Sequence, residues 1–257
     1  MPEILIKEPE EQEVTQKVAE EVVQEEVDEE VVQVSNGIYA RCIKRPVDFL
    51  LSLTAVTVLS PILLILTIIG AIVMKGNPFF IQKRPGMIDK KTGKERILSL
   101  VKFRTMTNER DSDGNLLPDE KRLVPYGKFL RSTSLDELPS IWNIVVGSCS
   151  LVGPRPLLVE YLPWYTEEER HRHDVRPGLT GWAQVNGRNS VDWDRRLQLD
   201  LEYVSKITLA KDIKIIFLTV KKVLSKSDIS ENTRETEGNF ADIRRAKAEH
   251  NQSEIMK

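Results

Sequence analysis

The sequence predicts a mixed, helix-rich α/β protein that attaches to a membrane near its N-terminus. Three observations lead to this fold class. Residues 49–74 form one run without charge, residues 77–106 alternate as paired strands do, and residues 192–224 repeat apolar side chains with helical spacing. A chain of 257 residues suits one domain with tails.

Charge divides the chain into an acidic leader and a basic body. Residues 1–37 hold 12 Asp or Glu and 2 Lys, a net charge of −10, so residues 38–257 carry about +8 of the total of −2. A basic body suits anionic lipid head groups and phosphorylated substrates, and we expect no nucleic-acid partner. Cys42 and Cys149 are too few for a disulfide framework, which favours a reducing compartment.

The leader, residues 1–37, has valines every four or five residues on a background of Glu and Gln. This spacing fits a weak amphipathic helix or a short coiled coil, whereas the repelling charges fit disorder equally well. We interpret the leader as a candidate arm for a protein partner or for self-association. The valines in question are Val14, Val18, Val22, Val27 and Val31.

The apolar run from Phe49 to Met74 is the predicted membrane segment. Its 26 residues would form a helix of about 39 Å, enough to cross a hydrocarbon core of about 30 Å. Ser60-Pro61 lies near the middle, where proline removes a backbone donor, so a kink or a break is expected there. The residues alone fit both a kinked spanning helix and a re-entrant helix–break–helix, because both flanks are basic. These flanking cations are Arg41, Lys44 and Arg45 before the run and Lys75, Lys83 and Arg84 after it.

Residues 77–106 are predicted to form a hairpin, because two strand-like segments flank a polar turn at residues 89–93. Lys102 and Arg104 alternate with apolar residues, so a strand places both cations on one face. That face is either solvated surface or a cradle for an anion. Residues 108–120 are rich in charge, Gly and Asn, and we expect a mobile loop there.

Asp136 and Glu137 are adjacent carboxylates in the segment Arg131-Ser-Thr-Ser-Leu-Asp-Glu-Leu-Pro139. Ser134 and Glu137 have the spacing of a capping box, which predicts a helix that opens after Ser134 and continues through residues 141–146. Acidic residues in a first helical turn are often only cap residues. The basic loops around this pair and the membrane segment before it favour a reactive pair instead.

Two later segments have the chemistry of anion-binding loops. Gly153-Pro154-Arg155-Pro156 holds one arginine between two prolines, which lowers the entropy cost of presenting a guanidinium to phosphate. The same pattern is equally common for an arginine that lies on the surface and binds no ligand. Residues 176–189 contain three glycines around amide side chains and Arg188, which predicts a loop that lines a ligand.

The region between these loops is rich in aromatic side chains. Tyr161, Trp164 and Tyr165 fit either a membrane interface or an ordinary core. His171 and His173 lack the spacing and partners of a metal site, so we expect both on the surface.

The C-terminal part is predicted to contain two helices, at residues 192–206 and 209–224. The second is basic and amphipathic, and it fits both a helix on an anionic membrane and one packed on the domain. The polar tail over residues 226–257 is expected to be disordered. No GxGxxG or P-loop pattern occurs, which excludes the usual dinucleotide and Walker motifs.

In the order and content of these motifs, the chain resembles the small monotopic phosphoglycosyl transferases of the bacterial sugar transferase family. The likeness extends from about Lys44 to Leu224, and several ordered blocks of this length are a specific signal. The acidic leader departs from the family pattern. The blocks are the segment broken at Ser60-Pro61, Val101-Lys-Phe-Arg-Thr-Met106, Arg131 to Pro139, Leu151-Val-Gly-Pro-Arg-Pro-Leu157 and Arg176 to Asn189.

The resemblance implies a particular architecture. Residues 38–76 would form a re-entrant membrane helix broken at Ser60-Pro61, and residues 77–225 a small cytosolic catalytic domain with amphipathic interfacial helices. The protein would lie on the cytoplasmic face of the bacterial inner membrane.

The resemblance also implies a reaction. A phosphosugar would pass from a UDP-sugar to undecaprenyl phosphate with release of UMP, and a UDP-acetamido-sugar such as UDP-N,N'-diacetylbacillosamine is the expected donor. Asp136 would be the nucleophile that carries the phosphosugar covalently, with Glu137 as its catalytic neighbour and Mg²⁺ bound at Asp136. The cations that would hold phosphates are Lys102, Arg131, Arg155 and Arg188.

Elementary electrostatics agrees with this assignment. A carboxylate that approaches a diphosphate is repelled, so the site needs a hard cation and fixed positive charges. A covalent intermediate lets a soluble donor and a lipid acceptor use one small site in turn. The alternative is a membrane-attached scaffold that recruits partners through its acidic leader, with Asp136 and Glu137 as helix caps.

Overall fold

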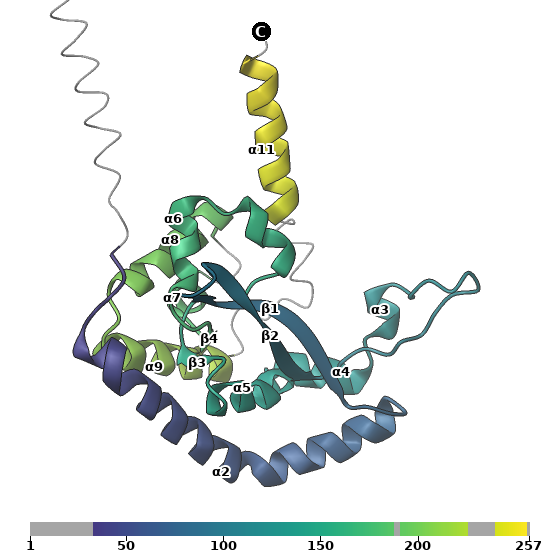
Figure 1. Ribbon diagram of the computed structural model, residues 1–257. Coiled ribbons are helices and arrows are strands. Elements are labelled where there is room, and N and C mark those ends of the chain that lie inside the picture. The colour runs from purple at the N-terminus through teal and green to yellow at the C-terminus, as the bar shows by residue number, and fades with distance from the viewer. Residues whose placement is uncertain (1–32, 188–190, 226–239, 256–257) are drawn as a thin grey trace, which may run out of the picture. The chain divides into compact units, whose positions relative to one another are not determined.

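The computed structural model describes residues 33–187, 191–225 and 240–255 (Figure 1). Nearly all of the predicted leader therefore lies outside the described residues, and so does the candidate phosphate ligand Arg188. The described chain is a mixed, helix-rich α/β structure, which confirms the coarse prediction. Its helical elements are η1 (Tyr39–Ile43), α2 (Lys44–Val73), α3 (Asp119–Arg122), α4 (Pro125–Ser132), η2 (Leu135–Ser140), α5 (Ile141–Val145), η3 (Val159–Trp164), α6 (Glu167–Arg170), η4 (His171–His173), α7 (Trp182–Asn186), α8 (Trp193–Ser205), α9 (Leu209–Ser225) and α11 (Phe240–Ile255).

Helix α2 contains Pro61 and is nevertheless continuous. Figure 1 shows a bend near its middle. The prediction of a complete break at Ser60-Pro61 is therefore corrected to a bend. The reason is local: Pro61 leaves the carbonyl of Thr57 without its helical donor, and the Ser60 hydroxyl donates to that carbonyl over 2.7 Å.

One face of α2 contacts the protein and the other is apolar and exposed. Asp48, Ser52, Leu66 and Gly70 are buried. The continuous helical segment Tyr39–Val73 is long and apolar enough to cross a membrane, judged by length and composition. The large exposed side chains of α2 are Phe49, Leu50, Leu51, Leu53, Val58, Ile62, Leu64, Ile65, Ile68, Ile69, Ile72 and Val73.

The predicted hairpin is confirmed by strands β1 (Phe79–Asp89) and β2 (Lys94–Phe103). The strands pair antiparallel with Phe79 opposite Phe103, and the two rings stack with centroids 5.5 Å apart. Phe103 joins Leu66 of α2 and Leu130 of α4 in a buried cluster, so the hairpin packs on the later part of α2.

A second, parallel pair joins β3 (Ser150–Val152) to β4 (Gly178–Thr180). The backbones of the two segments approach so closely that a Cβ on Gly178 would lie 2.1 Å from the backbone nitrogen of Gly153. Gly178 is therefore required by backbone packing, and the glycines that predicted a ligand loop serve the strand pair as well. Helices α8 and α9 cover this pair through Val152, Tyr203 and Ile215.

Three predictions for the C-terminal half are resolved by packing. Tyr161 and Tyr165 are buried in a core with Phe240, so the core interpretation of the aromatic stretch holds for them. The prediction that His173 lies on the surface was wrong, because this residue is only 3% exposed. Burial lowers the pKa of its imidazole to about 3, so the ring is neutral at neutral pH. Residues 240–255 form α11, contrary to the predicted disorder, because Phe240 supplies a buried contact that average composition hides.

Candidate active site

Asp136 and Glu137 lie in η2, a short 3₁₀-helix between α4 and α5. The predicted capping box is absent, because Ser134 has a φ of 56° and makes no side-chain cap hydrogen bond. A left-handed residue reverses the chain after α4, which a cap residue in extended conformation would not do. The turn, rather than a cap, therefore sets the direction in which the two carboxylates leave the backbone.

Glu137 is held by two of the predicted phosphate ligands. Its Oε1 accepts from Lys102 Nζ of β2 and from Arg155 Nη2 after β3, each over 2.7 Å. Burial alone would raise the pKa of Glu137, but Arg155 and Lys102 outweigh it and hold that pKa well below its ordinary value. Glu137 is thus a permanent anion that fixes two cations from distant parts of the chain.

The pKa of Asp136 is shifted in the opposite direction to that of Glu137. Burial and the neighbouring charge of Glu137 raise its pKa, and the charges of Lys102, Arg131 and Arg155 only partly offset them. The structure gives the Asp136 carboxylate no hydrogen bond or ion pair with any described residue. A partly buried carboxylate that is poorly stabilised as an anion is a stronger nucleophile than a paired one.

Arg131 stands close enough to act on Asp136 through space, but its side chain is directed elsewhere. Its Nε donates to the hydroxyl of Thr105 over 3.1 Å. The structure therefore brings Lys102 and Arg155 together at Glu137 and places Arg131 at the edge of the site. Arg188, the fourth predicted cation, is outside the described residues.

A small cavity opens beside Glu137, and it contains a cation that the sequence analysis assigned to the membrane flank. Arg84 of β1 lines this cavity together with Lys102 and Arg155. In the hairpin register Arg84 faces Leu98 and Phe80 faces Lys102, so Arg84 and Lys102 lie on the same side of the sheet. The turn at residues 89–93 alone would not have found Arg84, because a β-bulge between Pro85 and Ile88 shifts the register; without it Arg84 would pair with Ser99, on the other face from Lys102.

Cys149 also lines this cavity. Burial raises the pKa of its thiol to about 11, so the group is protonated at neutral pH. A buried, protonated thiol is a poor nucleophile. Asp136 and Glu137 therefore remain the candidate reactive groups of the site.

Behind Arg155 lies a buried ion pair that sequence analysis did not identify. The Arg172 side chain is 1% exposed and binds Asp200 of α8 through Nε at 3.1 Å and Nη2 at 2.6 Å. The same Nη2 donates to the backbone carbonyl of Arg155 over 2.8 Å. Only the fold brings Arg172 and Asp200 together, so no local pattern could have revealed this support.

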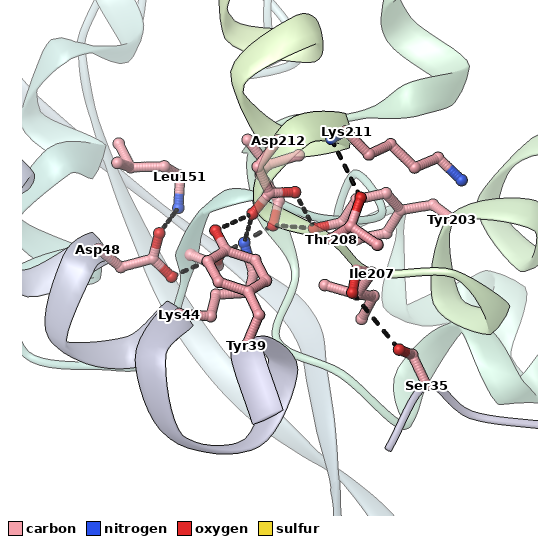
Figure 2. Close-up of polar contacts among 12 residues, drawn as sticks. Ser35, Tyr39, Lys44, Asp48, Leu151, Tyr203, Ile207, Thr208, Lys211 and Asp212 are labelled. Carbon is pink, nitrogen blue, oxygen red and sulfur yellow. Dashed lines mark hydrogen bonds and ion pairs between the residues drawn. The ribbon is translucent and has the colours of Figure 1, made fainter. Parts of the chain in front are cut away.

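The site is tied to the start of α2. Asp48 accepts from the Ser150 hydroxyl over 2.6 Å and from the Leu151 amide over 3.3 Å, as Figure 2 shows for Leu151. Arg45 donates to the carbonyls of Ile144 and Val145 at the end of α5. These contacts connect α2 to the end of α5 and to β3, both of which follow the carboxylate pair in the sequence.

A second polar cluster in Figure 2 holds η1 and α2 against α9. Asp212 accepts from Tyr39 over 2.7 Å, from Lys44 over 2.5 Å and from Tyr203 over 2.7 Å. Lys44 and Arg45, which sequence analysis treated as membrane-flanking charges, are therefore used for contacts inside the protein.

The later part of α2 reaches the same domain. The Tyr126 hydroxyl of α4 donates to the Leu66 carbonyl over 2.8 Å, and Leu66 is buried against Phe103 and Leu130. Helix α2 thus contacts one domain on both sides of its bend.

Helix α9 has an apolar face that the rest of the described chain leaves uncovered. Ile215 is fully buried on one side, so α9 packs on the domain as one of the two predictions had it. On the other side the chain exposes a row of apolar residues spaced by three or four. These residues are Leu209, Ile213, Phe217, Val220 and Val223.

Comparison with known proteins identifies a family and several relatives. The family model described as bacterial sugar transferase matches residues 39–226. An uncharacterized sugar transferase, EpsL, of Bacillus subtilis is 48% identical over 192 residues, which cover 75% of this chain and 90% of that protein.

Other relatives carry a substrate in their names, and two of them illustrate the range. The UDP-glucose:undecaprenyl-phosphate glucose-1-phosphate transferase of Klebsiella pneumoniae is 39% identical over 189 residues, 70% of this chain and 39% of that protein. An undecaprenyl-phosphate galactose phosphotransferase of Salmonella typhimurium is 45% identical over 108 residues, 42% of this chain and 23% of that protein. The chain therefore spans about two-fifths of the first of these enzymes and less of the second.

Proposed function

Because the chain belongs to the bacterial sugar transferase family, we propose that it moves a phosphosugar from a UDP-sugar to undecaprenyl phosphate and releases UMP. The observation that carries the proposal is the contrast within the carboxylate pair. Glu137 is paired with Lys102 and Arg155, whereas Asp136 beside it has a raised pKa and no partner among the described residues. This transfer would be the first membrane step in the synthesis of a polysaccharide or other glycoconjugate.

The reaction has two half-reactions. A carboxylate oxygen of Asp136 attacks the sugar-bound phosphorus of the UDP-sugar, the bond from that phosphorus to the bridging oxygen breaks, and UMP leaves. A phosphate oxygen of undecaprenyl phosphate then attacks the same phosphorus and releases the Asp136 carboxylate. The product is undecaprenyl diphosphosugar, and no oxidant or reductant is needed.

The protein's cations assist by fixing charge before the substrate arrives. Glu137 holds Lys102 and Arg155 in place, so these side chains do not have to reorganise when a diphosphate binds next to them. Arg131 adds positive charge near Asp136. Arg84 lines the same cavity and is a further candidate for the donor's phosphates.

Mg²⁺ suits this donor set. Within the described residues no group of three or more His, Cys, Asp or Glu side chains could hold a metal. Mg²⁺ is usually bound by one or two carboxylates together with substrate phosphates, and Asp136 supplies one such carboxylate. When bound, the ion would screen the negative charge of the diphosphate.

The membrane path that we propose is re-entrant, with the domain on the cytoplasmic face of the inner membrane. Arg45 and Asp48 contact the domain before the bend, and Leu66 contacts it after the bend. A spanning helix would place these two parts on opposite sides of a hydrocarbon core of about 30 Å. The exposed face of α2 enters lipid, and the apolar row on α9 lies at the interface.

The experiment that tests the reaction is release of UMP from UDP-sugars by membranes that contain the protein and undecaprenyl phosphate. The enzyme proposal expects Asp136→Asn to abolish release while the variant keeps its fold and membrane association. Unchanged turnover by Asp136→Asn would refute the nucleophile role of Asp136, whereas no UMP release by the parent protein with any UDP-sugar would favour the scaffold alternative.

The donor sugar is tested with a panel. The family resemblance led to a UDP-acetamido-sugar such as UDP-N,N'-diacetylbacillosamine, whereas the relatives with substrates in their names act on glucose or galactose donors. We keep the acetamido-sugar as the first candidate and UDP-glucose and UDP-galactose as competitors. Strict use of a plain hexose donor would overturn the first candidate.

A further inference from the structure

Helix α11 lies beyond the segment that matches the family model, yet its first turn is part of the core. The family match ends at residue 226, and α11 begins at Phe240. Phe240 is 0% exposed, and its ring centroid lies 5.3 Å from Tyr161, 5.4 Å from Tyr165 and 5.3 Å from Trp193. A side chain this well packed makes a large contribution to the order of its neighbours.

Ionic contacts hold α11 in the same place. Arg244 pairs with Glu169 of α6 and, over 2.9 Å, with Asp194 of α8. Lys247 pairs with Asp194 over 3.1 Å. One turn of α11 therefore joins two elements that are separate in the sequence.

From Phe240 a continuous chain of contacts leads to the active site. Phe240 packs on Tyr165, and the Arg172 guanidinium lies 5.6 Å from the centre of the Tyr165 ring. Arg172 donates to the Arg155 carbonyl over 2.8 Å. Leu157, two residues after Arg155, belongs to the same cluster as Phe240. The loop that carries Arg155 is thus held by Arg172, which lies against a ring that Phe240 contacts, and by Leu157, which belongs to the same buried cluster as Phe240.

We propose that α11 is a positioning element of the active site, in which Phe240 fixes the Arg155 loop through Tyr165, Arg172 and Leu157. Phe240 touches no substrate and acts only through Arg155. The inference rests on the proposed function, in which Arg155 binds a phosphate of the donor. A misplacement of about 1 Å in a binding group can cost on the order of 100-fold, so a loosened loop has a measurable effect.

The test measures binding of UDP, which carries the diphosphate and requires no knowledge of the sugar. The full-length protein in detergent, with Mg²⁺ present, is titrated with UDP by calorimetry. We expect Phe240→Ala to raise the Kd for UDP roughly tenfold. Phe240→Leu and Arg244→Ala should each raise this Kd less, by about threefold. Ile243→Ala is the matched control on a more exposed position of α11 and should leave Kd unchanged.

A double-mutant cycle separates positioning from general destabilisation. If Phe240 acts through Arg155, Phe240→Ala has no further effect on Kd once Arg155→Ala is present. The same fold-change in both backgrounds, or no change in Kd for Phe240→Leu and Arg244→Ala, would overturn the inference. These two milder variants also carry the test if Phe240→Ala does not fold.

The Arg155→Ala variant alone distinguishes the two levels of the proposal. If it leaves UDP binding unchanged, the proposed role of Arg155 fails and the inference fails with it. If it weakens binding but the α11 variants do not, the proposed function stands and α11 has no part in it.

Discussion

Asp136 and Glu137 are neighbours in one turn of 3₁₀-helix, yet the fold gives them opposite surroundings. Glu137 accepts from Lys102 and Arg155, and its pKa is held well below the ordinary value. Asp136 has no such partner among the described residues, and its pKa is raised by burial and by Glu137. We propose that the two carboxylates divide the roles, so that Glu137 orders the cations and Asp136 is the reactive group.

The largest effect is expected when each carboxylate of the pair is replaced in turn by its isosteric amide. Asp136→Asn removes the nucleophile, and we expect UMP release to fall by more than about 1,000-fold. Glu137→Gln keeps the nucleophile but loosens Lys102 and Arg155, for which we expect a loss of roughly 10- to 100-fold. Initial rates of UMP release measure both, with circular dichroism as the control for folding. Equal losses would show that the two carboxylates do not have separate roles.

The pH dependence of the rate sharpens the comparison. Asp136 must be ionised to attack, so activity is present above its raised pKa and is lost as the pH falls through it. Lys102 lowers that pKa, so Lys102→Met should move the acidic limb of kcat/KM to higher pH. Glu137 raises it, so Glu137→Gln should move the limb to lower pH. Shifts in the same direction would contradict the assignment of the titrating group to Asp136.

A smaller effect is expected at the edge of the cavity. Arg84 lines the cavity beside Lys102 and Arg155, whereas Arg104 lies just after β2 with its guanidinium near the carbonyl of Asn77. We expect Arg84→Ala to raise KM for the UDP-sugar about fivefold, because a cation near the diphosphate is lost. Arg104→Ala is the matched control, and an equal rise in KM there would refute a specific role for Arg84.

The smallest expected effect concerns the turn that presents the pair. Ser134 has a φ of 56°, which glycine adopts without strain, so Ser134→Gly should stabilise the protein by up to about 1 kcal/mol. Ser134→Ala should be close to neutral, because no cap hydrogen bond is lost. Urea denaturation in detergent measures both. A loss of about 1 kcal/mol for Ser134→Ala would instead support the capping box.

Local patterns were sufficient where the structure depends on neighbouring residues. The hairpin, the helical positions of α8 and α9 and the adjacent carboxylates follow from periodicity and turn chemistry over short stretches. The pairing of Lys102 and Arg155 with Glu137 was partly accessible, because the family resemblance implied that all three belong to one site.

The features that were missed depend on contacts between distant segments. Ser134 has capping-box spacing, but Glu137 is drawn to Lys102 and Arg155 instead of the backbone. Arg172 and Asp200 are 28 residues apart and only the fold makes them a pair. Phe240 lies in a polar tail whose composition favours disorder, but burial of this one ring anchors the helix that begins there.

The most direct test of the central claim is intact-mass and peptide mass spectrometry after incubation with the UDP-sugar donor and without undecaprenyl phosphate. The account predicts a mass increase of one phosphosugar on the peptide that contains Asp136. The adduct should be present in Glu137→Gln, absent in Asp136→Asn, and discharged when undecaprenyl phosphate is added. An adduct that persists in Asp136→Asn, or full turnover with no adduct in the parent protein, would contradict the account.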